Sequence, residues 1–320
     1  PDILHERGYP HPGSPSRTFR AGCAGSVGPM AAESTPIDGP RVARALAAAG
    51  DIGPFFAVTH SPKGPGWVPL GDLVSDAAVL VARVEAARAV IARSARQQPA
   101  SVDPRIAASI VFLGIAARLV SPPLAAAVLT GVIPRWTLDG LSVQPVTGGP
   151  WPLAAEASPG YFVHDLRSPG PWEAAGLPEG VDPWEAATPW EPAGLREAAD
   201  LLTATVIADV VGPVLGAVEE QFRVSRKILT GNVASGIAGA IGLLAVARPE
   251  RARLGYALAE NLLVRGILRD SGVFSRPSTS PGRGPAFVRR SCCLFYRIPG
   301  AGTCGDCILT APAASRNVAR

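Results

Sequence analysis

Lysine and methionine are nearly missing from this chain of 320 residues, whose 30 basic residues are otherwise all arginine. Lys63 and Lys227 are the lysines, and Met30 is the single methionine. Alanine, glycine and proline are abundant, which is typical of a GC-rich bacterial genome, so the choice of arginine over lysine carries no functional meaning. The net charge of +4 is small for this length, and the arginines are scattered. A nucleic-acid partner is therefore not expected.

Export signals and nucleotide-binding motifs are also missing. The residues before Met30 contain no basic segment followed by an apolar run, as a secretory signal would. We therefore expect Met30 to be the natural start, residues 1–35 to be a disordered extension, and the protein to be cytoplasmic. The chain also lacks a P-loop and a dinucleotide fingerprint.

Uninterrupted hydrophobic runs are scarce, although 47% of the residues are hydrophobic. The stretch 228–247 is long enough to span a bilayer, but it contains Asn232, Ser235 and four glycines. The stretch 106–133 is interrupted by Arg118 and by Pro122-Pro123. We therefore expect buried core helices, and peripheral association with a membrane surface stays open.

Two repeated patterns have ordinary structural explanations. Glycines at 236, 239 and 242 superficially resemble a nucleotide-binding loop, but no strand precedes them, so we interpret them as a site of close helix packing. Pro-Trp-Glu occurs three times between residues 171 and 191. We interpret this repeat as a local duplication in a surface loop, where the prolines exclude a helix.

Helical periodicity dominates most of the remaining sequence. Apolar residues recur at three- and four-residue intervals, and Asp-x-Pro or Asp-Pro opens two of the segments, as expected for helix starts. The predicted helices are 38–50, 71–97, 104–120, a further helix after Pro122-Pro123 up to about 132, 196–222 with a kink or break at Pro213, 226–247 and 251–269.

Strands are predicted in only a few places. Alternating apolar residues over 135–146 predict a hairpin around Asp139-Gly140, and 161–163 predicts another strand. Prolines and glycines over 272–285 indicate a linker. The predicted fold class is α+β. A mainly helical body at 36–280 carries a few antiparallel strands and is followed by a small C-terminal segment at 281–312.

Four of the five cysteines lie between residues 292 and 307, with the spacing C-C-x10-C-x2-C. In Cys304-x-x-Cys307 a tight turn brings both thiolates onto one metal atom. Gly305 suits that turn because glycine tolerates positive φ. Proline and glycine in the ten-residue gap allow the chain to fold back. This spacing predicts a metal site.

The adjacent pair Cys292-Cys293 distinguishes between kinds of metal site. Their Cα atoms lie about 3.8 Å apart, and in an extended strand their side chains would point to opposite faces. Both bind only if the backbone turns, or if the bound group is large enough to be reached from two sides. The pair therefore favours a four-thiolate [2Fe-2S] cluster. Structural zinc, which usually takes two Cys-x-x-Cys knuckles, and disulfides remain the alternatives.

Residues 289–307 read Arg-x-x-Cys-Cys-Leu-x-Tyr-Arg followed by Cys-x-x-Cys. This pattern resembles the C-terminal signature of the FhuF-like ferric siderophore reductase family. Weaker similarities lie at 118–122 (Arg-Leu-Val-Ser-Pro) and 232–235 (Asn-Val-Ala-Ser). The resemblance covers most of 36–310, although only the cysteine pattern is diagnostic. It implies a [2Fe-2S] cluster bound by Cys292, Cys293, Cys304 and Cys307.

The resemblance also implies a reaction, namely one-electron reduction of a ferric siderophore with release of Fe(II). The expected partners are a ferric siderophore and a separate protein electron donor. Arg289, Arg290 and Arg297 flank the cysteines, and Asp306 is the single acid from 281 to 320. We hypothesise that these arginines attract an anionic ferric complex or an acidic donor. The alternatives are an Fe–S electron carrier or redox sensor, and a siderophore-binding or assembly protein with a structural zinc tail.

Overall fold

The structure is a computed structural model that describes residues 34–62, 64–146, 149–164, 166, 194–275 and 285–310. Residues 1–33 of the predicted extension and the Pro-Trp-Glu repeats lie outside these ranges. The predicted boundary between body and cysteine segment, at 280–281, also lies outside them, so it stays a prediction. Ala32–Arg320 forms one compact unit, which includes the cysteine segment.

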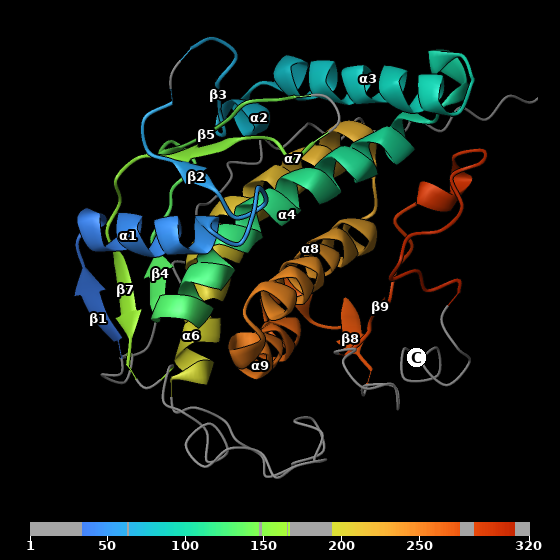
Figure 1. Cartoon of the computed structure of the whole chain (residues 1–320). Coiled ribbons are helices and arrows are strands. Elements are labelled where there is room, and N and C mark those ends of the chain that lie inside the picture. The colour runs from blue at the N-terminus through green and yellow to red at the C-terminus, as the bar shows by residue number, and fades with distance from the viewer. Residues whose placement is uncertain are drawn as a thin grey trace, which may run out of the picture. The chain divides into compact units, whose positions relative to one another are not determined.

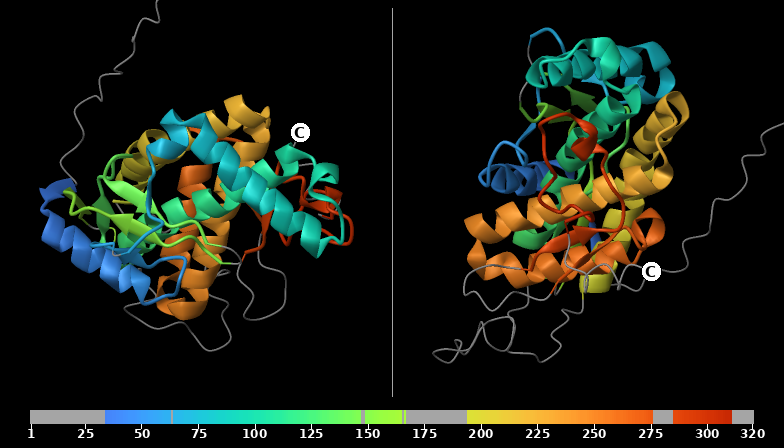
Figure 2. Two further views of the ribbon diagram at one scale, coloured as in Figure 1. Left: turned by 90° about the horizontal axis from the view of Figure 1, so that it is seen from above. Right: turned by 90° about the vertical axis from the view of Figure 1, so that its right-hand side faces the viewer.

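The fold is α+β and mainly helical, as the sequence predicts. The helices α4 and α8 lie side by side, with α1 and α3 against α4 and α9 against α8 (Figures 1 and 2). The bounds are α1 Gly39–Gly50, α2 Asp72–Ser75, α3 Ala77–Ser94, α4 Pro104–Thr130, α6 Leu195–Leu202, α7 Gly212–Phe222, α8 Arg226–Ala247 and α9 Ala252–Leu263. Short 3-10 turns are η1 Pro99–Ser101, η3 Pro249–Arg251, η4 Gly266–Leu268 and η5 Phe295–Arg297.

Local capping explains where several helices begin. The Asp38 carboxylate accepts the N–H of Arg41 at 3.1 Å and caps α1, as predicted. Asp76 caps α3 by accepting the N–H of Ala78 at 2.8 Å. The helix predicted at 71–97 is therefore divided into α2 and α3 at this aspartate. α9 ends at Leu263, earlier than predicted, and the 3-10 turn η4 follows it.

The prediction that Pro122-Pro123 ends a helix is wrong. Both prolines lie inside α4, which continues to Thr130. A proline removes one helical hydrogen bond and crowds the preceding turn, but almost all of this part of α4 is buried. Side-chain packing on all sides therefore outweighs the local cost, as tertiary context often does.

Arg118 does not interrupt α4 either. Its side chain is 2% exposed and donates hydrogen bonds to the carbonyls of Phe55, Ala57 (2.7 Å) and Trp151 (2.6 Å). Burial lowers the pKa of this guanidinium to about 10. The arginine therefore ties α4 to two loops instead of facing solvent.

The helix predicted at 196–222 is confirmed, with a change of winding before Pro213. A π-helical segment, η2 (Thr203–Val211), connects α6 to α7. Pro213 lies at the start of α7, where a missing N–H costs little. The proline thus alters the helix without ending the helical run.

Three helical stretches are long and apolar enough to cross a membrane by length and composition alone. They are Pro104–Thr130, Leu195–Phe222 and Arg226–Ala247, with 72%, 56% and 61% of the apolar window buried inside the protein. The expectation that 106–133 and 228–247 form core helices is in line with the burial of Pro104–Thr130 and Arg226–Ala247.

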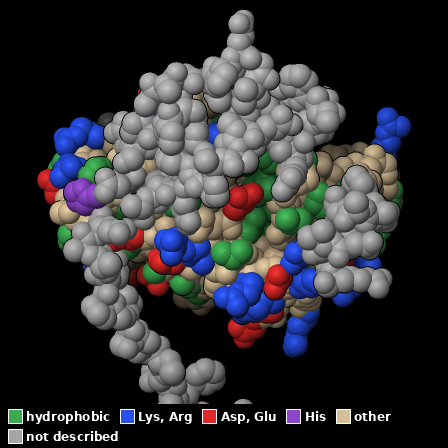
Figure 3. Space-filling view, turned by 90° about the horizontal axis from the view of Figure 1, so that it is seen from below, with side chains coloured by type: hydrophobic (Ala, Val, Ile, Leu, Met, Phe, Trp, Pro, Cys, Tyr) green, Lys and Arg blue, Asp and Glu red, His purple; other side chains and the backbone are tan. Residues whose placement is uncertain are grey.

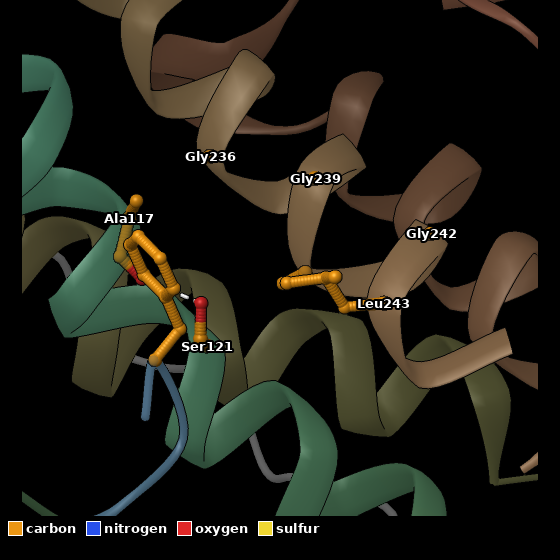
Figure 4. A pocket seen from close by; sticks show the side chains of 8 residues that line it. Ala117, Ser121, Gly236, Gly239, Gly242 and Leu243 are labelled. Atoms are coloured by element: carbon orange, nitrogen blue, oxygen red, sulfur yellow. Dashed lines mark hydrogen bonds between the residues drawn. The ribbon is translucent and has the colours of Figure 1, made fainter. Parts of the chain in front are cut away.

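A hollow of about 430 Å³ lies between α4 and the glycine-rich face of α8 (Figure 4). Ala117 and Ser121 line one side, and Gly236, Gly239 and Leu243 line the other. A Cβ at Gly236 would lie 3.0 Å from the Ala117 backbone, so this glycine allows close packing as predicted. A Cβ at Gly239 would meet nothing within 4 Å. Of these two glycines, Gly236 is therefore needed for the close packing of α8 against α4, and Gly239 is not.

The strands form three small sheets. Their orders are β1-β7-β4, β2-β6-β5-β3 and β8-β9. All described pairs are antiparallel except β2 with β6, which are parallel. The bounds are β1 Ser34–Ile37, β2 Val58–Thr59, β3 Val68–Pro69, β4 Val132–Pro134, β5 Leu141–Val143, β6 Leu153–Ala155, β7 Gly160–Val163, β8 Gly272–Phe274 and β9 Phe287–Arg289.

Two strand predictions need correction. The hairpin around Asp139-Gly140 is wrong, because β4 and β5 on either side belong to different sheets. β5 pairs instead with β6 and β3, so partners distant in sequence decide its place. The linker predicted at 272–285 is wrong at its start, where β8 pairs with β9 in the register Gly272↔Arg289. The strand predicted at 161–163 is confirmed as β7.

Candidate metal centre

The cysteine segment begins where β9 ends and runs against α8 and α4 (Figure 1). It contains little regular structure apart from η5. Leu294, directly after the adjacent cysteines, has a φ of 70°. This left-handed residue turns the backbone directly after the adjacent pair Cys292-Cys293.

None of the four cysteines in this segment carries a disulfide, and two of them are in contact. The Sγ atoms of Cys293 and Cys304 are 3.4 Å apart. Two thiolates bound to one tetrahedral ion at about 2.3 Å would lie about 3.8 Å apart, whereas a disulfide needs about 2.05 Å. Cys293 and Cys307 are buried, and Cys292 and Cys304 are half-buried. The distance suits two ligands that share a metal atom.

The surroundings make the thiols of Cys292 and Cys304 hard to ionise without a cation, because they raise the pKa of both. Burial raises the pKa of Cys292, the Leu294 N–H opposes that rise, and the nearby Cys293 and Cys307 add to it. Burial also raises the pKa of Cys304, as do its contact with Cys293 and the Asp306 carboxylate. A bound metal ion or cluster would supply the compensating positive charge, since metal ligation requires thiolates.

The thiols do not already converge on a single point. Within the described ranges, no group of three or more His, Cys, Asp or Glu side chains is arranged so that it could hold one metal ion. The four-thiolate site thus stays a prediction, supported by the clustering of the four cysteines.

Arg289 lies under the cysteine segment and is completely buried. Its Nη2 donates a hydrogen bond to Asn232 Oδ1 on α8, and its Nε lies 3.9 Å from Asp306 Oδ2. Its backbone N–H also donates to the Asp306 carbonyl at 3.2 Å. This burial removes Arg289 from the predicted docking surface, because a side chain with no exposed area contacts no partner.

Hydrogen bonds extend from Arg289 into both central helices. Asn232 Nδ2 donates to the carbonyl of Ser109 on α4 at 2.8 Å and to its hydroxyl at 3.0 Å. The Ser109 hydroxyl donates to the Cys293 carbonyl at 2.9 Å. Ser235, one turn after Asn232, donates to the Asp306 carboxylate. We call Ser109, Asn232, Ser235, Arg289 and Asp306 the buried network.

The buried network was missed by sequence reasoning, although a signal for it was present. Asn232 and Ser235 are polar residues in an otherwise apolar helix, and buried polar groups need hydrogen-bond partners. Both also lie in one of the short stretches that resemble the FhuF-like family. Only the structure shows that their partners are Ser109 and the cysteine segment.

A glycine allows α8 to approach the cysteine segment. A Cβ at Gly231 would lie 2.1 Å from Ser291 Oγ and 3.3 Å from Arg289 Nη2. No real Cβ atom fits at 2.1 Å, so a larger residue at 231 would force the Ser291 hydroxyl to move. Gly231 therefore sets the distance between α8 and the residue that precedes the cysteines.

Some buried polar atoms of Arg289 and Ser291 have no hydrogen-bond partner among the described residues. They are Arg289 Nε, Arg289 Nη1 and Ser291 Oγ. Such atoms are costly in a folded protein unless a further group pairs with them. Arg289 is also close enough to lower the pKa of Cys292. A buried cation with spare donors beside four thiols fits a resident group of negative charge, as a four-thiolate iron–sulfur cluster is.

The other two flanking arginines face outward to different degrees. Arg290 is half-buried, and its Nη1 pairs with Asp270 Oδ1 at 2.7 Å. Arg297 is exposed and packs over the ring of Tyr296, with 5.9 Å between its guanidinium carbon and the ring centre. Figure 3 shows one face on which Lys and Arg side chains form separate groups, several of them beside acids. A docking role for Arg290 and Arg297 stays a prediction.

Comparison with known families bears on the cysteine segment. Residues 289–307 match the family described as the FhuF 2Fe-2S C-terminal domain. The matched segment begins at the buried Arg289 and ends at Cys307, and it includes all four clustered cysteines. The match implies an iron–sulfur redox protein of the siderophore-reductase type. A comparison of the whole sequence with curated proteins found no match.

Proposed function

We propose that the protein reduces Fe(III) in siderophore complexes by one electron, through a [2Fe-2S] cluster bound by Cys292, Cys293, Cys304 and Cys307. The observation that carries the proposal is a buried cation, Arg289, which has spare hydrogen-bond donors and lies on the same short segment as four free thiols. The family match at 289–307 supports the same kind of cofactor.

The residues of the chain have distinct tasks in this proposal. The cysteines bind the cluster, and a [2Fe-2S] cluster exchanges one electron at a time. Arg289 balances its negative charge from within the protein. Asn232 and Ser109 hold the segment against α8 and α4 by the hydrogen bonds described above. The buried network therefore positions the redox centre at the edge of the helical core.

The overall reaction balances with one electron. An external donor protein loses one electron, and Fe(III) in the chelate gains it to become Fe(II). Oxygen donors of hydroxamate or catecholate type hold Fe(II) far more weakly than Fe(III), so the metal is released. The lack of a dinucleotide fingerprint supports a separate protein as the donor. The four unpaired cysteines support a reducing compartment such as the cytoplasm.

The cofactor is tested on protein purified without oxygen. We expect two irons and two acid-labile sulfides per chain, visible absorption, and an EPR signal after dithionite reduction. Serine in place of any of the four cysteines should lower the iron content, whereas Cys23→Ser is the matched control and should keep it. Colourless protein with stoichiometric zinc and no EPR signal would contradict the cluster.

The reaction is tested separately from the cofactor. Protein reduced with dithionite and freed of excess reductant is mixed with ferric siderophores, and ferrozine traps the Fe(II) that is released. We expect one Fe(II) per reduced cluster. A reducible cluster that releases no Fe(II) from catecholate or hydroxamate complexes would instead indicate an electron carrier or redox sensor.

A further inference from the structure

A second hollow, of about 540 Å³, lies beside the cysteine segment, where the start of α8 meets the chain between η4 and β8. Cavities of roughly 300–1,000 Å³ are the size that proteins use for small molecules. None of its lining residues is a predicted cluster ligand. Its polar lining, which we call the basic pocket, consists of Arg226, Lys227, Thr230, Arg269, Asp270 and Arg290.

The basic pocket has an excess of positive charge. Arg226 Nη2 pairs with Glu219 at 2.8 Å outside the lining, and Arg290 pairs with Asp270 inside it. Lys227 and Arg269 are exposed and have no carboxylate within ion-pair distance in the part of the chain that the structure describes. Like charges around a concave site concentrate positive potential and attract anions.

The geometry around Asp270 indicates that Arg290 is held in place. Asp270 has a φ of 62°, in the left-handed region that aspartate adopts more readily than most residues other than glycine, so the chain turns here. The backbone N–H of Arg290 donates to the Ser271 carbonyl at 2.9 Å, next to the pair between Arg290 and Asp270. The ion pair and the backbone hydrogen bond thus hold Arg290 at the wall of the basic pocket.

The basic pocket adjoins the proposed redox centre. Arg290 precedes Cys292 by two residues, so their Cα atoms lie at most about 7 Å apart. On the opposite wall, Thr230 precedes Gly231, whose Cα approaches Ser291 closely. A molecule in the basic pocket would therefore lie next to the chain that carries the first two cysteines.

We propose that the basic pocket binds the substrate as an anionic metal chelate. This inference rests on the proposed function and narrows its substrate class. Three catecholate dianions around Fe(III) give a complex of net negative charge, whereas three hydroxamate monoanions give a neutral one. The excess of cations therefore selects tris-catecholate complexes over tris-hydroxamate complexes.

A small chelate suits the basic pocket better than an acidic donor protein does. Protein partners that meet weakly and transiently bind to broad surfaces, and such interfaces cover several hundred Å² on each side. The four cations here surround a hollow instead of covering a broad face. Docking of an acidic donor protein at the basic pocket is therefore the alternative that the experiment below distinguishes from chelate binding.

Binding is tested with gallium(III) chelates, because gallium(III) matches the charge of iron(III) and is not reduced. Gallium tris-catecholate and gallium tris-hydroxamate are titrated into cluster-loaded protein by calorimetry. We expect the catecholate complex to bind at least about tenfold more tightly, and the difference to shrink as salt screens the charges. Because no electron moves, a failure of the reductase proposal leaves this measurement valid.

Charge-reversing variants locate the binding site. Lys227→Glu and Arg269→Glu change exposed residues, so folding should be unaffected, and each should weaken catecholate binding by about tenfold or more. Arg93→Glu on α3 is the matched control, because it reverses an exposed arginine outside the basic pocket. Unchanged affinity in both pocket variants, or equal binding of the two chelates, would overturn the proposal. The proposal would also be overturned if the pocket variants still bound the chelate but their cluster were no longer reduced by an acidic ferredoxin-type donor.

Discussion

Replacing Asn232 by alanine tests the buried network directly. Asn232 is completely buried and makes three hydrogen bonds, one from the Arg289 guanidinium and two to Ser109. Alanine removes all three and leaves the charged group of Arg289 without this acceptor. We therefore expect the variant to loosen the cysteine segment as well as to lose overall stability.

The size of the effect follows from the bonds that are lost. A hydrogen bond to a charged group contributes about 1.5–3 kcal/mol, and a neutral one about 1 kcal/mol. Because the two bonds to Ser109 share one amide group, we expect the free energy of unfolding to fall by about 3–5 kcal/mol in total. That is a large share of the roughly 5–15 kcal/mol that stabilises a typical domain.

The measurement is chemical unfolding followed by circular dichroism, with bound iron determined in parallel. Asn261→Ala on α9 is the matched control, because Asn261 also contacts an arginine, Arg265 Nη1 at 3.0 Å, but is only half-buried. It should cost no more than about 1 kcal/mol. An Asn232→Ala variant that loses less than about 1 kcal/mol and keeps its full iron content would refute the reasoning.

Other changes test neighbouring features. Gly231→Ala places a Cβ 2.1 Å from Ser291 Oγ, so thermal unfolding should show a loss of about 1–3 kcal/mol, partly restored by adding Ser291→Ala. Gly239→Ala, whose Cβ meets nothing within 4 Å, should instead stabilise α8 by up to about 1 kcal/mol, and equal effects of the two alanines would count against this. Arg289→Gln should lower the reduction potential, by about 59 mV per tenfold loss in stabilisation of the reduced form. An unchanged potential in an EPR-monitored titration would argue that Arg289 does not balance the cluster charge. Arg118→Met leaves three carbonyls without their donor and should cost at least about 3 kcal/mol of unfolding free energy, without loss of iron from the folded fraction.

The sequence predicts those parts of the fold that depend on residues close together in the chain. Asp38 caps its helix through its own neighbours, so the start of α1 was visible in the sequence. The end predicted at Pro122-Pro123 was wrong because burial along α4, supplied by other helices, outweighs the local effect of proline. The hairpin at Asp139-Gly140 was wrong because β5 finds its partners in β3 and β6, which no local pattern encodes.

The same division applies to the candidate site. The cysteine spacing is local, and it marks the four candidate ligands in the sequence alone. The buried network is not local, since Asn232 and Ser109 are 123 residues apart and Ser109 and Cys293 are 184 apart. A single sequence contains no information on such a pairing beyond the presence of polar residues in apolar helices. Arg289 was therefore predicted to be an exposed docking residue, because its partner Asn232 on α8 could not be identified from the sequence.

The adjacent arginines Arg289 and Arg290 show how one short segment can serve two sites. Successive side chains of an extended strand point to opposite faces, and β9 ends at Arg289. Arg289 is accordingly buried in the network beneath the cysteines, and Arg290 lines the basic pocket. A ligand that binds Arg290 therefore contacts the residue between Arg289 and Ser291, both of which lie against α8. In the proposed reductase, substrate binding and the environment of the redox centre would be joined through two consecutive residues, rather than through a long pathway across the fold.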